Sequence, residues 1–224
     1  MSDRSRQDES ARQAIEILDK ILQKDDAIIK VVKNAEKFAE RTSKVENREN
    51  RTAQFIVMHY SNLCAAGGGA SALTGLIPGL GTILSVFGAG AADAFLALKF
   101  ELEMSLALAH LAGYDISDPR ERKIAFLMAC KGLEDAYNAD KEPNIKSVID
   151  LAVGEYSTRE LSKTLTKAFA RAIMFFAAKK WTRFFPIVGI AIGASINQVL
   201  TAKLGYSIWK SISIRKNAMQ PQQP

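Results

Sequence analysis

Residues 93–121 read DAFLALKFELEMSLALAHLAGYDISDPRE, and this stretch decides the fold class. Its large apolar residues recur at three- to four-residue steps, which is the spacing of one helix face. They are Phe95, Leu98, Leu102, Leu106 and Ala109. Asp93 is placed to cap this helix at its start, and Gly113 is placed to end it as a C-cap. The pattern predicts a helix over residues 93–112.

A second helix follows after a short polar connection. Pro119 suits the first helical position and Glu121 suits the first turn of a helix. Either Ser117 or Asp118 is the N-cap, because a side-chain oxygen there can accept a hydrogen bond from a free backbone N–H group. The helix is expected to run to Tyr137.

The rest of the chain carries the same helical signals. Helices are predicted over four further ranges: 11–42, 45–64, 157–183 and 203–216. Ser157 and Glu160 have the spacing of a capping box. Alternation of apolar and polar residues never persists long enough for a strand. The predicted fold class is therefore all-α, a single compact helical domain over residues 13–216 with disordered ends at 1–12 and 217–224.

Length and composition limit the class of protein. A chain of 224 residues suits one domain that buries a core without disulfides. Its hydrophobic fraction of 48% and charged fraction of 24% exclude a disordered or fibrous chain. Two cysteines are too few for a disulfide scaffold, and both Cys64 and Cys130 are expected to be buried as small hydrophobes. The first residues lack a secretory signal pattern, so a cytoplasmic location is expected.

Two long segments carry no formal charge. The first spans residues 52–92 and holds eight of the fourteen glycines, and the second spans residues 184–202. Small residues let helices approach closely, so both segments are predicted to be helical, either inserted in a bilayer or packed as a buried core. Their marker residues are Gly67, Gly68, Gly69, Pro78, Gly79, Gly81, Pro186, Gly189 and Gly193. A phosphate-binding loop is excluded, because no Gly-Lys-Ser or Gly-Lys-Thr follows the glycines.

Positive charge gathers toward the end of the chain. Residues 154–216 hold eleven basic and two acidic side chains, a net charge of +9. Four basic residues recur every four positions from Arg159, and three more follow: Arg159, Lys163, Lys167, Arg171, Lys179, Lys180 and Arg183. A basic helix beside apolar segments suits an anionic membrane surface, at about 1 kcal/mol per basic residue. Nucleic acid is the less favoured polyanion, since no motif for binding it is present.

Residues for catalysis or metal binding show no strong pattern. His59 and His110 are far apart and lack the spacing of a metal site. Glu101 and Glu103 are expected to be solvated, and together with Asp93 they do not form a compact oxygen cluster. No nucleophile motif is present. The sequence predicts no metal site and no cofactor.

Three blocks of the sequence resemble the EcsC family of bacterial proteins in their order and separation. They are AGGGA (66–70) through IPGLG (77–81) to Asp93, then GYDISDP (113–119), then PIVG (186–189) through GASIN (193–197). The resemblance covers residues 50–216. It implies a helical bacterial protein, in a family named after a protein encoded beside an ABC transporter, some of whose members carry a hydrolase label. The polar positions in these blocks are Asp93, Asp115, Asp118 and Asn197.

Residues and resemblance together lead to one expected function and two alternatives. The chain is expected to be an accessory protein of the EcsC kind, bound to the inner face of an anionic cell membrane peripherally or by an inserted hairpin. Its protein partner would be a membrane protein such as an ABC transporter. The first alternative is a hydrolase of a lipid or lipid-linked substrate, with Asp93, His110 and Asp118 as the first catalytic candidates. The second is a membrane-permeabilising protein, because glycine-rich hairpins occur in pore formers.

Overall fold

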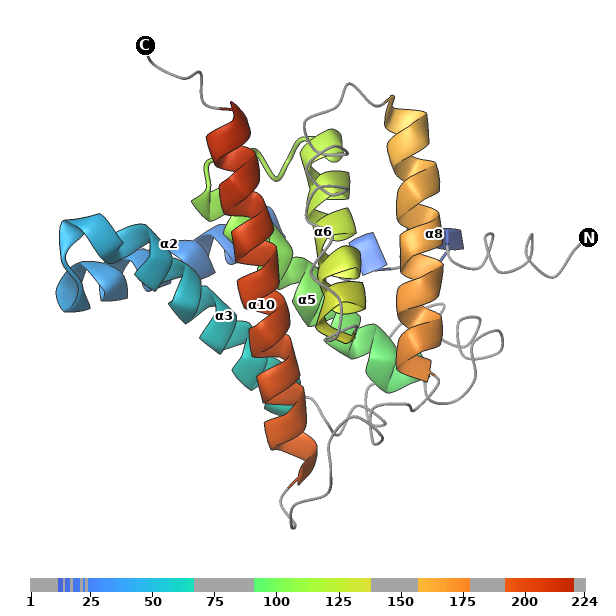
Figure 1. Cartoon of the computed structure of the whole chain (residues 1–224), viewed down its shortest axis with the longest axis horizontal. Helices are drawn as coiled ribbons and strands as arrows, with labels where there is room; N and C mark the ends of the chain where they lie inside the picture. Colours follow the sequence, from blue (N-terminus) through green and yellow to red (C-terminus); the bar gives the residue numbers. More distant parts are fainter. Residues whose placement is uncertain are drawn as a thin grey trace, which may run out of the picture.

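The fold is a bundle of helices (Figure 1). A computed structural model describes residues 12–13, 15–16, 18–20, 22, 24–66, 91–137, 157–177 and 192–219. The elements are α2 (Asp25–Thr42), the 3-10 turn η1 (Val45–Asn47), α3 (Arg48–Ala66), α5 (Ala91–Leu111), α6 (Pro119–Tyr137), α8 (Thr158–Ala177) and α10 (Ile192–Met219). Every element in these ranges is helical, so the predicted all-α class is confirmed.

One hydrophobic core joins the long helices, and α5 lies at its centre. This helix packs against α2, α3, α6, α8 and α10. All its residues from Glu101 to Ala109 are buried. A helix that is apolar on nearly every side is stable only in the interior, so its neighbours must surround it. The longest helix, α10, crosses α3 and packs most extensively there, while α6 and α8 pair on the other side (Figure 1).

Two glycines allow α10 to approach its neighbours closely. A Cβ atom at Gly205 would lie 2.7 Å from Val57 Cγ2 and 2.9 Å from Met104 Sδ, and one at Gly132 would lie 2.6 Å from Leu204 Cδ1. Such distances leave no room for a side chain. Of the glycines and prolines predicted to pack or insert, Gly193 is in the first turn of α10. The others lie outside the described residues: Gly67, Gly68, Gly69, Pro78, Gly79, Gly81, Pro186 and Gly189.

The predicted single helix over residues 11–42 is wrong, because the chain breaks between two helical stretches. Leu22 lies in a bend, and Lys24 has an extended ψ of 148° before α2 begins. Asp25 and Asp26 occupy the first turn of α2, where negative charge stabilises a helix N-terminus. The apolar spacing nevertheless predicted burial correctly, since Leu18 and Leu22 both join the core.

The connection between α5 and α6 bears out two capping signals. Gly113 has a φ of 93°, the left-handed conformation of a helix C-cap. Between the two proposed N-caps of α6, the structure selects Asp118, whose Oδ1 accepts a hydrogen bond from the backbone N of Arg120 at 2.8 Å. Ser117 instead donates to Asp115 Oδ1 from its backbone N at 2.9 Å and from its hydroxyl at 2.6 Å.

Several predicted boundaries are corrected. The helix predicted over 203–216 begins earlier, at Ile192. Because α5 begins at Ala91, Asp93 lies in its first turn and does not cap it; two alanines, the strongest helix formers, precede it. At the other end, α10 continues to Met219, so the chain is still helical where a disordered tail was predicted. The Tyr114 hydroxyl lies 3.9 Å from Met219 Sδ and gives this last turn a contact. Arg12 is also helical, one residue before the predicted start of the domain.

Candidate functional site

The clearest candidate site is the outer side of α8, at one edge of the bundle (Figure 1). Four cations spaced four residues apart are all exposed there, and we call them the basic face: Arg159, Lys163, Lys167 and Arg171. The opposite side of the helix is buried in the core through Leu161, Leu165, Phe169 and Ala172. The predicted basic stripe is therefore exposed over these four positions. Lys179, Lys180 and Arg183 lie outside the described residues.

A capping box holds the start of this helix. The Glu160 carboxylate accepts hydrogen bonds from the backbone N of Ser157 at 3.0 Å and from its hydroxyl at 2.9 Å. In return, the Ser157 hydroxyl accepts one from the Glu160 backbone N at 3.3 Å. These bonds, with nearby Lys163, lower the pKa of Glu160. The box was predicted from spacing alone, because it joins groups three residues apart.

The charge of the basic face is not neutralised within the described parts of the chain. Glu160 is the one acidic residue in α8, and its single negative charge, which lies near Lys163, offsets only part of the four positive charges of the face. None of the four cations of the face forms an ion pair with another described residue. Exposed, uncompensated cations on one face attract polyanions. The arrangement can therefore bind a surface of negative charge.

The prediction that Glu101 and Glu103 are solvated is wrong. Both side chains are buried in α5, at 3% and 0% exposed. Lys99 Nζ lies 2.6 Å from Glu103 Oε1 and supplies a counter-charge. Glu101 Oε2 has no hydrogen-bond partner among the described residues, and burial raises the pKa of Glu101 well above its ordinary value. The two glutamates are buried because other helices surround α5, and the spacing of residues within α5 does not predict those neighbours.

Cys64 of α3 lies near these carboxylates and is buried, as predicted, and so is Cys130. Burial, with the nearby Glu101, raises the pKa of Cys64 to about 12. A thiol with that pKa is almost entirely protonated at neutral pH, so Cys64 is a poor nucleophile. His59 is on the same helix, and burial lowers its pKa. Of these polar side chains, Glu101, Glu103 and Cys64 are buried and near one another, while His59 is exposed.

The three catalytic candidates are placed as follows. Asp118 is exposed, and its carboxylate caps α6. His110 is half-buried in the last turn of α5, close enough to Asp115 to lower the pKa of that carboxyl, though the Ser117 hydrogen bonds lower it more. Asp93 belongs to the first turn of α5, and its side chain lies outside the described residues, as does that of Asn197. Asp115 and Asp118 thus both shape the α5–α6 connection.

The described residues contain neither a metal-binding cluster nor a membrane-spanning helix. No group of three or more His, Cys, Asp or Glu side chains within them could hold a metal ion. Of the helices in the same ranges, none combines the length and the apolar character needed to cross a membrane.

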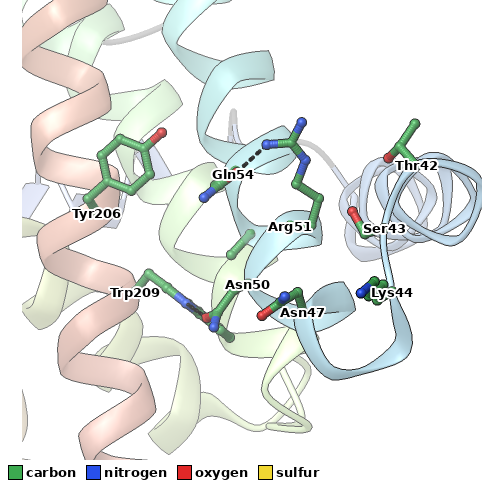
Figure 2. A pocket seen from close by; sticks show the side chains of 10 residues that line it. Thr42, Ser43, Lys44, Asn47, Asn50, Arg51, Gln54, Tyr206 and Trp209 are labelled. Carbon is green, nitrogen blue, oxygen red and sulfur yellow. Dashed lines mark hydrogen bonds between the residues drawn. The ribbon is translucent and has the colours of Figure 1, made fainter.

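Sequence reasoning missed a pocket between the α2–α3 connection and α10 (Figure 2). Its volume is about 620 Å³. The lining includes Lys44, Asn50, Arg51, Gln54, Tyr206 and Trp209. Residues 159 positions apart meet there: Trp209 Nε1 donates to Asn50 Oδ1 at 2.9 Å. The only feature of the sequence that pointed to this pocket was the polar, amide-rich start of α3. That feature does not predict that α10 packs beside it.

Comparison with known proteins assigns no relative. No family model matches the chain, and no curated protein or solved structure is significantly similar to it. The resemblance to EcsC proteins therefore stays a prediction that these comparisons neither support nor contradict.

Proposed function

We propose that this chain is a peripheral membrane protein that binds anionic lipid through the basic face of α8. The supporting observation is that four exposed cations share one side of a helix whose other side is anchored in the core. The resemblance to EcsC proteins extends the proposal to an accessory role at the inner face of the cell membrane, beside a membrane protein such as an ABC transporter.

The energetics predict weak, salt-sensitive binding by this face alone. Each basic residue near an anionic surface contributes about 1 kcal/mol, so four contribute about 4 kcal/mol. That free energy corresponds to a dissociation constant of about 1 mM. Lys179, Lys180 and Arg183 would add to it, and so would insertion of the glycine-rich segments. Salt discriminates between these contributions, because it screens charge but does not weaken apolar insertion.

The test is flotation of the purified full chain with liposomes, with and without phosphatidylglycerol, at low and high salt. The test variant reverses the basic face: Arg159→Glu, Lys163→Glu, Lys167→Glu and Arg171→Glu. The chain offers a matched control on α2, where four exposed cations have nearly the same spacing: Lys30→Glu, Lys33→Glu, Lys37→Glu and Arg41→Glu. Both variants change the net charge by the same amount, and circular dichroism checks that both remain helical.

The proposal expects salt-sensitive flotation with phosphatidylglycerol, lost in the α8 variant and kept in the α2 control. Equal loss in both variants would reduce the effect to net charge and overturn the role of α8. Flotation that persists at high salt in the α8 variant would assign binding to inserted apolar segments instead. Leakage of a trapped dye in that case would favour the membrane-permeabilising alternative.

A further inference from the structure

The pocket between the α2–α3 connection and α10 lies at the opposite edge of the bundle from α8 (Figure 1). One wall is the segment from Thr42 to Gln54, and the other is the α10 face that carries Tyr206 and Trp209 (Figure 2). None of the described residues that line the pocket belongs to α8. What the pocket binds is therefore a separate question from what the basic face binds.

Charge in the pocket is of one sign. Lys44 and Arg51 line it, and none of its other described lining residues is acidic. Glu49, the acidic residue next to Asn50, forms an ion pair with Lys216, whose Nζ lies 2.6 Å from Glu49 Oε1. Neither Lys44 nor Arg51 has an ion-pair partner in the part of the chain that the structure describes. Two cations without counter-charges favour an anionic ligand.

The Arg51 guanidinium is held in place by neutral groups. Its Nη1 donates to Gln54 Oε1 at 2.8 Å, the contact dashed in Figure 2. Its Cζ lies 5.3 Å from the centroid of the Phe55 ring. A hydrogen-bonded amide and an aromatic face orient the side chain without cancelling its charge. The remaining donors of its planar fork are suited to phosphate oxygens.

A second part of the pocket suits hydroxyl groups. Asn50 is fixed by the Trp209 indole, and Asn47, Gln54, Ser43 and Tyr206 add further amide and hydroxyl groups. The rings of Trp209 and Tyr206 offer apolar surface of the kind that packs on the carbon skeleton of a polyol. The volume of about 620 Å³ is in the ordinary range for a small-molecule site.

A second cavity differs from the pocket at Arg51 because its arginine already has carboxylate partners. It lies beside Arg122, has a volume of about 540 Å³ and is also lined by Asp19 and Asp25. There the Arg122 guanidinium already forms two ion pairs. Its Nε lies 2.7 Å from Asp19 Oδ1, and its Nη1 lies 2.9 Å from Asp25 Oδ1. An anion that binds to Arg122 would have to displace both carboxylates. The pocket at Arg51 imposes no such displacement.

We propose that the pocket lined by Lys44, Arg51, Asn50 and Trp209 binds a small phosphorylated polyol, such as a sugar phosphate or a glycerol phosphate. A phosphate monoester carries a charge of about −1.5 to −2 near pH 7, which matches the two cations. The amides and rings bind the hydroxylated part. The ligand is either a soluble metabolite or the headgroup of a lipid, since the same chemistry occurs in both.

Trp209 makes the site directly measurable. The chain has two tryptophans, so a Trp181→Phe background leaves Trp209 as the sole indole reporter. Its fluorescence is titrated with glucose 6-phosphate, glycerol 3-phosphate, glucose and inorganic phosphate, and calorimetry repeats each titration. The proposal expects each phosphorylated polyol to bind at least tenfold more tightly than glucose or phosphate alone. Equal binding of inorganic phosphate, or no binding of either polyol phosphate, would overturn it.

Variants test the assigned residues. Arg51→Gln and Lys44→Gln, both at exposed positions, should each weaken binding about tenfold or more, because each removes a charge-assisted hydrogen bond. Lys163→Gln removes the same kind of charge from α8 and should change nothing. Unchanged affinity in Arg51→Gln, or equal weakening in Lys163→Gln, would contradict the proposal.

The source of the ligand is decided by comparing glycerol 3-phosphate with dihexanoyl phosphatidylglycerol, a short-chain lipid whose headgroup is a glycerol phosphate with two free hydroxyl groups. Binding of both compounds identifies a lipid headgroup as the ligand, and binding of the unacylated one alone identifies a soluble metabolite; either result supports the site. Failure here is distinct from failure of the proposed membrane binding, because the α8 variant should keep its Trp209 response and Arg51→Gln should keep its liposome flotation.

Discussion

The Arg215 guanidinium and the Glu121 carboxylate form a bidentate ion pair that joins α10 to the first turn of α6. Nη1 lies 2.6 Å from Oε2, and Nη2 lies 2.7 Å from Oε1. The Arg215 side chain is 2% exposed, and its Cζ lies 4.0 Å from the centroid of the Tyr114 ring. An arginine taken this far out of water depends on its partner, because an unpaired buried charge is costly.

Glu121→Gln should therefore lower the free energy of unfolding by about 3 kcal/mol, since it leaves Arg215 buried without a counter-charge. Arg215→Met leaves the more exposed Glu121 behind and should cost less. The double variant should cost clearly less than the sum of the two, because no charge is stranded in it. Urea unfolding of the four proteins measures this cycle. Additive costs would mean that the pair is not energetically coupled.

Gly205→Ala should destabilise the fold by about 1–3 kcal/mol through overpacking. The new methyl group would meet Val57 Cγ2 at 2.7 Å and Met104 Sδ at 2.9 Å. Truncation by Val57→Ala should recover part of that loss in the double variant. Gly113→Ala is the contrasting control, because nothing lies within 4 Å of its Cβ position and its cost comes from the φ of 93°. Urea midpoints that show no rescue by Val57→Ala would disprove the steric explanation.

Glu101 should make the protein less stable as pH rises. Burial raises its pKa in the folded state, so the folded chain binds more protons than the unfolded chain above the ordinary carboxyl pKa. The free energy of unfolding then falls from that pH upward and levels off above the folded pKa. Each tenfold difference in proton affinity contributes about 1.4 kcal/mol.

Glu101→Gln removes this titration. The variant and the natural chain should have similar stability near pH 4, and the variant should be the more stable at pH 8. Chemical unfolding at the two pH values measures the difference. Glu103→Gln is the matched control two residues away and should destabilise instead, because it removes the partner of Lys99. A pH-independent difference for Glu101→Gln would show that Glu101 is not the titrating group.

Ser157→Ala should loosen the start of α8 and cost about 1 kcal/mol, the usual effect of losing an N-cap. The backbone N of Glu160 loses its acceptor. Hydrogen exchange should speed up in the first turn of α8 and stay unchanged in α3. Thr164→Ala, later in the same helix, is the control for loss of a side-chain hydroxyl. Equal exchange in both variants would contradict a role for the capping box.

Signals that act over a few neighbouring residues were sufficient for much of the fold. The capping box at Ser157, the N-cap at Asp118 and the C-cap at Gly113 each join groups at most five positions apart. Helical spacing also predicted which side of α8 carries the charges, because burying Leu161 and Leu165 forces the intervening cations outward. The break before α2 was missed, since the apolar spacing continues across it.

The sequence by itself determined the helical class, the caps at Gly113, Asp118 and Ser157 and the exposure of the basic face, because these depend on contacts within one or two turns. The tertiary structure alone decided that Glu101 and Glu103 are buried, that Arg215 pairs with Glu121, and that Asn50 meets Trp209. Each of these depends on which helices surround a residue, and those neighbours come from positions far away in the chain. Burial and long-range pairing are properties of the assembled bundle, so spacing within a single helix carries no record of them.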